Sequence, residues 1–170
     1  MANAMTNAPA SGICAIGLHR PKDHQNIGST LRAAHCYGAK LVAIAGARCT
    51  RSPLDTMCAY RHIPVISGND LHEMIPFDCI PIAVDLLPDA IPLHQFHHPK
   101  RAFYIFGPED STLGKAIHDW CKFKVFVPTN GCMNLAATVN VVLYDRQAKQ
   151  LLAAANKISP MPTKKELQNV

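Results

Sequence analysis

The chain has 170 residues, a formal net charge of +5 at pH 7 and a mean hydropathy of +0.02. This length is enough for one core of ordinary size, so the fold needs neither disulfides nor a structural metal. The seven cysteines are scattered without a Cys-x-x-Cys pair, which argues against a disulfide framework and a zinc ribbon. Because the start lacks the regions of a signal peptide and no segment is apolar enough to span a bilayer, we expect a cytoplasmic protein without a membrane partner. The positive charge favours a polyanion as binding partner but is too small to establish nucleic-acid binding by itself.

Short apolar runs alternate with helical patterns along the chain. This alternation is typical of an α/β fold, a mostly parallel sheet with helices on both faces. The apolarity of the runs is nearly continuous, which indicates strands that are buried on both faces. The expected strands are residues 13–18, 41–46, 63–67, 80–86, 101–106 and 124–128.

Five helices are expected, and each begins at a residue that can cap a helix N-terminus. They are residues 26–37, 52–60, 69–75, 111–122 and 134–156. Gly38 would end the first of them just after Tyr37. Residues 12–157 would form a single domain between a mobile N-terminal tail, residues 1–11, and a polar C-terminal tail, residues 158–170.

Open α/β sheets bind ligands at the carboxyl ends of their strands, but the usual nucleotide motifs are missing there. No Gly-x-Gly-x-x-Gly follows the first strand. The segment GPEDSTLGK has the wrong spacing for a P-loop, and Ala116 stands where that loop needs Ser or Thr. Glu109 and Asp110 would also repel a phosphate in this loop. A nucleoside triphosphatase is therefore disfavoured.

Three loops at the carboxyl edge carry a more specific combination of residues. An Asn-x-Gly-x-x-x-Arg motif begins at Asn26 and ends at Arg32. A Gly-x-Glu motif follows a central strand, with Gly107 and Glu109 as its ends. A Val-Pro pair then leads through a Gly-containing loop, residues 127–135, into the last helix. Such a loop exposes backbone N–H and C=O groups, which could read an adenine edge and a ribose without phosphate chemistry.

This ordered set of motifs resembles the SpoU/TrmH family of S-adenosylmethionine-dependent RNA ribose 2′-O-methyltransferases, which belong to the SPOUT class. The resemblance covers about residues 12–155. It implies a parallel α/β sheet whose C-terminal part is threaded into a deep trefoil knot, a rare exception to unknotted chains. It also implies a homodimer in which the long last helix helps to form the interface and both subunits complete the site.

The resemblance places S-adenosylmethionine in the knot, bent and held chiefly by backbone groups, and it implies no metal. By position, the residues that line the cofactor or lie beside it would be Leu86, Gly107, Val127, Cys132, Met133 and Leu135.

Arg32 matches the catalytic arginine of the family. Because an arginine does not readily lose its proton, we interpret Arg32 as a group that orients the ribose 2′-hydroxyl and the adjacent phosphate and stabilises the alkoxide as it forms. Glu109 would orient Arg32 or accept a substrate hydrogen bond. Asn26 and Asn134 would hold the loops in register.

The resemblance makes RNA the expected partner, with transfer RNA ahead of ribosomal RNA because family members with an added RNA-binding domain are longer. Basic side chains near the carboxyl edge are candidate phosphate contacts, although they could equally form a solvated face. These candidates are Arg20, Lys22, Arg48, Arg51 and Arg61.

The sequence departs from the family pattern in two places. Cys132 and Met133 precede Asn134, where the family commonly has Ser-Leu-Asn, so a serine hydrogen bond to cofactor or substrate is weakened or lost. Asp110 replaces a more frequent glycine and adds negative charge near an RNA site. An alternative function is therefore a knotted RNA-binding paralogue that has lost methyl transfer. A base methyltransferase of the same superclass is disfavoured, because the Asn26 to Arg32 motif belongs to the ribose branch.

The histidine-rich segment His94-Gln95-Phe96-His97-His98 invites a metal interpretation. No carboxylate or cysteine completes a ligand spacing there. We therefore expect a surface loop.

Overall fold

The computed structural model describes residues 12–49 and 59–158, with side chains through residue 155. Within these residues, seven strands form one sheet in the order β3-β2-β1-β6-β4-β7-β5, and all neighbouring strands are parallel. The α/β fold with a parallel sheet is thereby confirmed. The strands are β1 Ile13–His19, β2 Leu41–Ala45, β3 Val65–Gly68, β4 Ile80–Val84, β5 Ile91–Pro92, β6 Arg101–Phe106 and β7 Phe123–Phe126.

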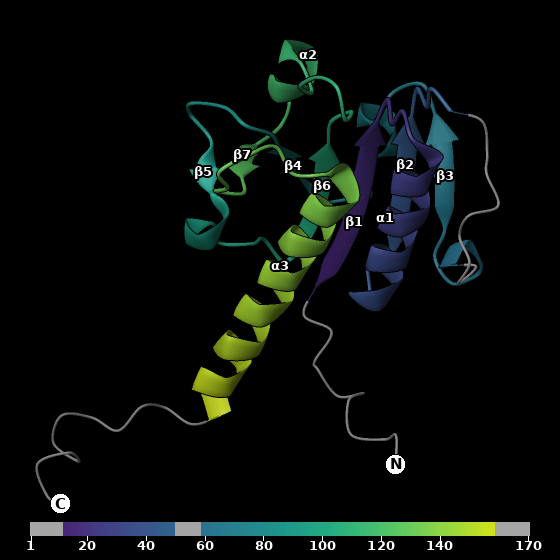
Figure 1. Cartoon of the computed structure of the whole chain (residues 1–170). Coiled ribbons are helices and arrows are strands. Elements are labelled where there is room, and N and C mark those ends of the chain that lie inside the picture. The colour runs from purple at the N-terminus through teal and green to yellow at the C-terminus, as the bar shows by residue number, and fades with distance from the viewer. Residues whose placement is uncertain (1–11, 50–58, 159–170) are drawn as a thin grey trace, which may run out of the picture.

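The two faces of the sheet are covered differently. The helices α1 (His24–Cys36) and α3 (Leu135–Ile158) lie side by side on one face (Figure 1). The other face packs against the short helix α2 (Lys115–His118) and the 3-10 turn η2 (His72–Met74). Two further 3-10 turns, η1 (Ala59–Arg61) and η3 (Leu93–Gln95), lie in the connections. Helices on both faces are thereby confirmed.

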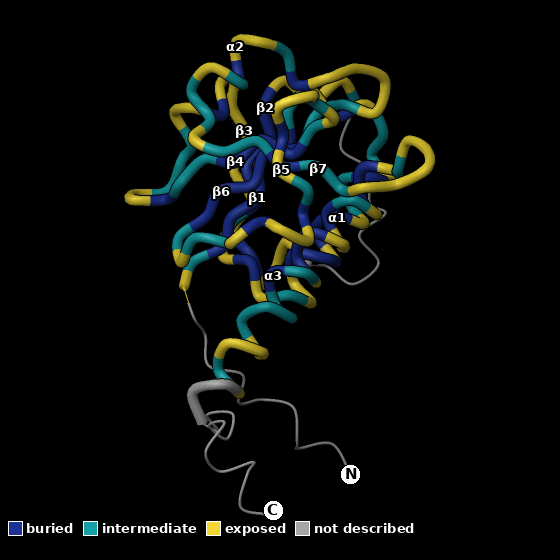
Figure 2. Tube along the Cα trace, turned by 90° about the vertical axis from the view of Figure 1, so that its left-hand side faces the viewer, coloured by how far each residue is buried: buried dark blue, intermediate teal, exposed yellow. Residues whose placement is uncertain are grey.

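Alternation along the central strands divides the core into two layers. On the α1 and α3 face, Tyr104 and Phe106 of β6 pack with helix residues such as Leu31 and Leu143. On the opposite face, Phe103 of β6 packs in a second cluster with α2 and η2. Figure 2 shows the buried strands at the centre and the exposed far end of α3. The apolar runs are thus explained by burial on both sides of the sheet.

The six expected strands are all present, with ends that differ by up to two residues. The edge strand β5 was missed, since two residues that include a proline give no strand signal. β4 ends at Val84 rather than at Leu86, because Asp85 and Leu86 already turn into the loop.

The predicted start of the first helix is wrong. α1 begins at His24, and Asp23 is its N-cap, with the Asp23 carboxylate accepting a hydrogen bond from the backbone N–H of Gln25 at 2.8 Å. Asn26 therefore lies inside the helix, where its side chain is buried and available for tertiary contacts. The predicted end is confirmed, since Gly38 follows the C-cap Tyr37 with a positive φ of 70°.

Two other predicted caps are also wrong. At η2, Asp70 rather than Asn69 accepts a hydrogen bond from the backbone N–H of His72. α2 begins at Lys115 and not at Ser111, since the preceding residues bend past the end of β4. The helix expected at residues 52–60 lies largely outside the described residues, as do both tails.

The last helix agrees with the prediction. α3 begins at Leu135, and the Asn134 side chain accepts hydrogen bonds from the backbone N–H groups of Ala136 and Ala137. The trefoil knot stays a prediction. No described helix combines the length and apolarity needed to cross a membrane.

Candidate active site

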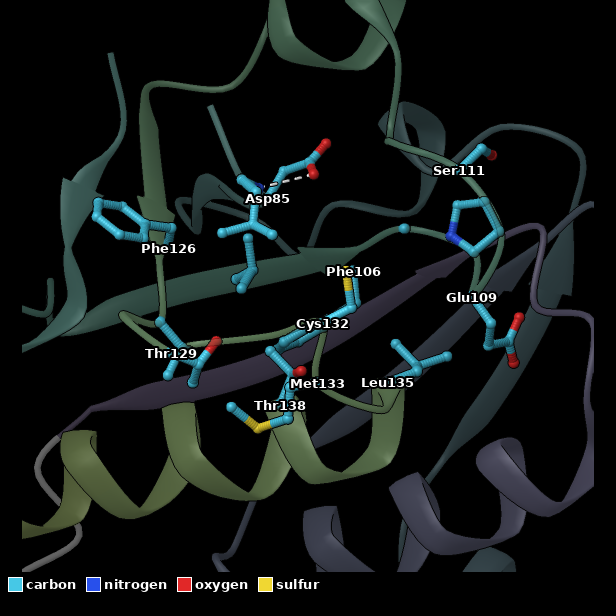
Figure 3. A pocket seen from close by; sticks show the side chains of 15 residues that line it. Asp85, Phe106, Glu109, Ser111, Phe126, Thr129, Cys132, Met133, Leu135 and Thr138 are labelled. Atoms are coloured by element: carbon cyan, nitrogen blue, oxygen red, sulfur yellow. Dashed lines mark hydrogen bonds between the residues drawn. The ribbon is translucent and has the colours of Figure 1, made fainter. Parts of the chain in front are cut away.

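A pocket opens at the carboxyl edge of the sheet, between the ends of β4, β6 and β7 and the first turn of α3 (Figure 3). The parallel sheet brings the loops after these strands to one edge, although they are far apart in the sequence. All six residues predicted to lie around the cofactor line this pocket: Leu86, Gly107, Val127, Cys132, Met133 and Leu135.

Close backbone packing explains the glycine at one wall of the pocket. A Cβ atom built on Gly107 would lie 3.3 Å from the backbone nitrogen of Leu113, which is tighter than most side-chain contacts. A side chain at residue 107 would therefore require the backbone at Leu113 to shift by a few tenths of an ångström. This is a structural requirement and is compatible with a ligand on the other side of the loop.

Several lining residues were not singled out from the sequence. They are Val84, Asp85, Phe106, Pro108, Ser111, Phe126, Thr129 and Thr138. Apolar members of this set continue the strand ends, and no pattern separates them from ordinary core residues. Asp85 could have been found, because a carboxylate directly after a buried strand at the ligand edge is the same signal that pointed to Glu109.

The three motifs are joined by one chain of hydrogen bonds. The Asn26 Nδ2 donates to Glu109 Oε1 at 2.7 Å, and the Asn134 Nδ2 donates to Asn26 Oδ1 at 2.8 Å. The same Asn134 caps α3 through its Oδ1. A helix interior, a strand end and a helix start are therefore locked together beside the pocket. The sequence predicted that Asn26 and Asn134 hold the loops in register, and these hydrogen bonds are the contacts through which they would do so.

Glu109 is bound to the start of α1. Its carboxylate accepts hydrogen bonds from Asn26 and from the backbone N–H groups of Lys22, at 2.9 Å, and Asp23, at 3.2 Å. Burial alone would raise the pKa of Glu109, but these hydrogen bonds together hold the pKa below its ordinary value. Glu109 is thus an anion at neutral pH and a poor proton acceptor.

Arg32 does not contact Glu109, so the predicted orientation of Arg32 by Glu109 is wrong within one chain. Arg32 is exposed on α1, and its side chain forms no hydrogen bond or ion pair with another described residue. It lies six residues after Asn26, which is about 9 Å along a helix. Arg32 is also absent from the lining of the pocket. Among the residues that the structure describes, its guanidinium therefore has no partner.

Two of the candidate phosphate contacts are engaged by a carboxylate. Arg48 binds the Asp110 carboxylate through two nitrogens, at 2.6 and 3.1 Å, and the Lys22 Nζ lies 3.6 Å from the same carboxylate. The hydrogen bonds from Arg48 lower the pKa of Asp110 to about 2, so this pair is ionised at neutral pH.

The other three candidates form no ion pair with Asp110 that the described residues show. Arg20 is exposed at a positive φ of 49° after β1. Arg61 lies over the Tyr60 ring, with 5.9 Å between its Cζ and the ring centroid. Arg51 lies outside the described residues.

A second carboxylate, Asp85, anchors the rim of the pocket. Its side chain accepts hydrogen bonds from the backbone N–H groups of Leu86 and Leu113 at 2.8 and 2.9 Å, and it contacts the His118 Nε2 at 3.0 Å. These contacts tie the loop after β6 and the helix α2 to the end of β4. Asp85 therefore sets the position of the loop that follows Glu109.

The expected surface loop at the histidine-rich segment is wrong in part. Phe96 is 3% exposed, and the His98 side chain is buried between Tyr104 and Asp145. Among residues 12–49 and 59–155, no cluster of histidine, cysteine and carboxylate side chains could hold a metal ion. Six cysteines, Cys14, Cys36, Cys49, Cys79, Cys121 and Cys132, are free thiols.

The fold and the pocket together define a class of protein, namely an α/β protein with a ligand site built from loops at the carboxyl edge of a parallel sheet. The model of the SpoU rRNA Methylase family matches residues 14–144, and the chain belongs to this family. No curated protein gives a significant match.

Solved structures share the fold. The SpoU methyltransferase AviRb from Streptomyces viridochromogenes superposes with a TM-score of 0.75 at 18% identity, over 83% of this chain and 61% of its own. A structure of AviRb in complex with AdoMet gives a TM-score of 0.73, also at 18% identity, over 84% and 62%. The TrmH/SpoU tRNA modifying enzyme of A. aeolicus gives 0.73 at 14% identity, over 91% and 83%. The chain thus spans about three fifths of the length of AviRb.

Proposed function

We propose that this protein is an S-adenosylmethionine-dependent RNA methyltransferase that acts on a ribose 2′-hydroxyl. The observation that carries the proposal is the meeting of three sequence motifs beside one pocket, joined by Asn26, Glu109 and Asn134. Membership of the SpoU rRNA Methylase family supports the reaction class. AviRb has been solved with AdoMet, which supports the choice of cofactor.

The lining of the pocket fits this cofactor. Apolar side chains such as Leu86, Val127 and Leu135 offer surfaces for an adenine ring, and the loops present backbone polar groups. Asp85 and Glu109 add negative charge at the rim, which suits a ligand with a positive sulfonium and an ammonium group. When bound, S-adenosylmethionine supplies an electrophilic methyl group on a good leaving group.

The residues of the chain would contribute mainly by positioning. We assign to Arg32 the orientation of the ribose 2′-hydroxyl and its neighbouring phosphate and the stabilisation of the developing alkoxide. Glu109, with its hydrogen bonds from Lys22, Asp23 and Asn26 in place, would fix the strand end and could still accept a bond from a substrate hydroxyl. The hydroxyl proton would leave to phosphate or water, since neither Arg32 nor ionised Glu109 is a suitable base.

The site needs a second copy of the chain. Arg32 does not reach the pocket of its own chain, so we propose that it serves the pocket of a partner subunit in a homodimer. An exposed apolar stripe on α3 offers an interface, with Val141, Tyr144, Leu151 and Leu152 at helical spacing. α1 lies beside α3 on the same face of the sheet, which keeps Arg32 near such an interface (Figure 1).

Transfer RNA is the proposed substrate, and a cytoplasmic location is proposed with it. One structure of the same fold, at 20% identity and a TM-score of 0.71, concerns the 2-OH methylation of C/U34 on tRNA. That chain is matched over 92% of its length, so its size is close to that of the domain matched here. Ribosomal RNA is the second candidate, since the family is described as an rRNA methylase family.

The test is transfer of a labelled methyl group from S-adenosylmethionine to unmodified tRNA and rRNA, with cofactor affinity measured in parallel. Labelling of tRNA supports the proposal. Labelling of rRNA without labelling of tRNA would make rRNA the substrate in place of tRNA. Cofactor binding without transfer to any RNA would contradict the proposed activity on these substrates. RNA binding with no cofactor affinity would identify the alternative, an RNA-binding paralogue without methyl transfer, which the Cys132 and Met133 departure motivates.

A further inference from the structure

We infer that Asp110 is an acidic gate on an RNA phosphate site formed by Arg48 and Lys22, and that an RNA phosphate takes the place of the Asp110 carboxylate when substrate binds. The inference rests on the proposed function and deepens it, since it names a residue that sets affinity and salt dependence for RNA. Asp110 is also one of the two places at which this chain departs from the family pattern.

The guanidinium of Arg48 is held in place independently of Asp110. Its Nε donates to the carbonyl of Arg20 at 3.1 Å, and the backbone N–H of Arg48 donates to the carbonyl of Pro21 at 2.9 Å. The two terminal nitrogens remain for a bidentate acceptor, and Asp110 now occupies both. A phosphate presents the same pair of oxygens to an arginine as a carboxylate does. Arg48 is therefore already oriented for a phosphate.

The pair of Arg48 and Asp110 is exposed enough for exchange. The side chains of Arg48, Asp110 and Lys22 are 33%, 42% and 62% exposed. Ion pairs at such exposure contribute little to stability, because solvent screens them. Losing the contact with Asp110 thus costs the free protein little, and water can solvate the released carboxylate.

The numbers of basic and acidic side chains near Asp110 are equal, and this balance is the reason for proposing that Asp110 moves away from Arg48 when RNA binds. The loops after β1, β2 and β6 carry Arg20, Lys22 and Arg48. Among residues 20–23, 46–49 and 107–114, which directly follow these strands, the carboxylates of Asp23, Glu109 and Asp110 equal these basic side chains in number. With Asp110 bound to Arg48, this region has no net positive charge to attract a polyanion.

The position of the gate fits a ribose at the pocket. Glu109 lines the pocket, and Asp110 is the next residue. Lys22 links both, because its backbone N–H donates to Glu109 while its side chain approaches Asp110. A phosphate on Arg48 would therefore flank the nucleotide whose ribose enters the pocket, which is where a positioning contact is useful.

The experiment measures binding of fluorescently labelled unmodified tRNA across a range of salt concentrations, with S-adenosylhomocysteine present to prevent turnover. The variants are Asp110→Asn, Arg48→Gln and the double variant. Asp119→Asn is the matched control, because Asp119 is an exposed carboxylate paired with Lys115 on α2, away from these loops. Unfolding curves show whether each variant is folded under the conditions of the binding measurement.

We expect Asp110→Asn to bind roughly threefold to tenfold more tightly at low salt, with a salt dependence steeper by about one phosphate contact. Arg48→Gln should weaken binding, and in its background Asp110→Asn should gain little. Unchanged or weaker binding by Asp110→Asn would overturn the gate, as would an equal gain in Asp119→Asn or in the Arg48→Gln background. If the unaltered protein binds no RNA while it binds the cofactor, the proposed function falls together with the gate.

Discussion

Two hydrogen-bond networks hold α3, one at its first turn and one in its middle, and they differ in how completely they are closed. The first network joins Asn134 to Asn26 and Glu109 beside an open pocket. The second network joins His98 and Tyr104 to Asp145 and Arg146 beneath the helix. In the first network the Glu109 carboxylate faces a ligand site, and the guanidinium of Arg32 on α1 has no partner in the described part of the chain. In the second network the charged groups are paired with one another or with backbone carbonyls.

The comparison separates polar groups that are buried to hold the fold together from polar groups that are buried beside a ligand site. Arg146 is only 4% exposed, yet its guanidinium donates to the carbonyls of Pro99 and Lys100 and to the Tyr104 hydroxyl. Such a closed network fixes the position of α3 and leaves nothing for a ligand. The network beside the pocket is also held by hydrogen bonds between side chains, but its Glu109 carboxylate lines a cavity. Changes in the first network should therefore affect turnover, and changes in the second should affect stability.

The largest effect is expected for Arg32→Ala. If Arg32 orients the ribose hydroxyl, its removal should lower kcat about 100-fold to 1,000-fold. Stability and cofactor affinity should stay close to those of the unaltered protein, because Arg32 has no partner among the described residues. Methyl-transfer rates, unfolding curves and calorimetric titration measure the three quantities. Turnover of Arg32→Ala near the normal rate would contradict the assignment of Arg32 to the active site.

Mixing variants tests whether Arg32 serves a partner subunit. Arg32→Ala and Asn134→Ala are expected to be inactive alone, whereas subunit exchange between them should form hybrid dimers with one intact site. Such a mixture should recover about a quarter of normal activity if exchange is random. No recovery in a mixture shown by mass spectrometry to contain hybrids would place the complete site within one chain.

Arg146→Met should lower the free energy of unfolding by about 3 kcal/mol, because it leaves buried acceptors without a donor. Arg101→Met is the matched control, since Arg101 also donates to a backbone carbonyl, that of Phe77, but its side chain is 34% exposed. The control should cost about 1 kcal/mol or less. Chemical denaturation measures both. An equal loss in the two variants would contradict the structural role assigned to the closed network.

Cofactor binding should protect one thiol selectively. Cys132 and Cys36 are both exposed, but only Cys132 lines the pocket. S-adenosylmethionine should slow alkylation of Cys132 by iodoacetamide about tenfold and leave Cys36 unaffected. Cys14 should react slowly throughout, because burial raises the pKa of its thiol to about 12. Mass spectrometry of the alkylated peptides resolves the sites. Equal protection of Cys36 and Cys132 would indicate a global effect instead of a filled pocket.

The smallest effect is a pH dependence of stability from His98. Burial lowers the pKa of His98 below the ordinary value of 6.5, although Asp145 opposes this shift. The unfolded chain therefore binds a proton more readily than the folded chain, so stability should fall as the pH drops below 6.5. Denaturation at about pH 7.5 and about pH 5.5 should show this loss, and His98→Asn should reduce it. An unchanged slope in the variant would assign the dependence to other groups.

The fold was predictable because strand burial and helix periodicity are local signals in this chain. The three motifs also pointed to the pocket, since loops that follow parallel strands must meet at one edge. The partner of Glu109 was not predictable. Asn26 has the side chain of a helix cap, but Asp23 takes that role and frees Asn26 for a contact with a residue far along the chain.

The charge pairing at the rim was also beyond the sequence. Arg48 and Asp110 are 62 residues apart, and only the folded loops show that one masks the other. In the same way, His98 lies in a polar run that reads as a surface loop, whereas Asp145 on α3 makes its burial possible. Long-range pairing of polar groups was thus the part of the site that composition and spacing could not supply.

The most direct test of the central claim is the identity of the methylated nucleoside. Unmodified tRNA treated with the protein and S-adenosylmethionine should be digested by nuclease and its nucleosides separated by mass spectrometry. The account predicts a 2′-O-methylnucleoside, which Arg32→Ala should fail to produce at a comparable rate. A methylated base in its place would contradict the assignment of Arg32, Glu109 and the pocket to ribose chemistry.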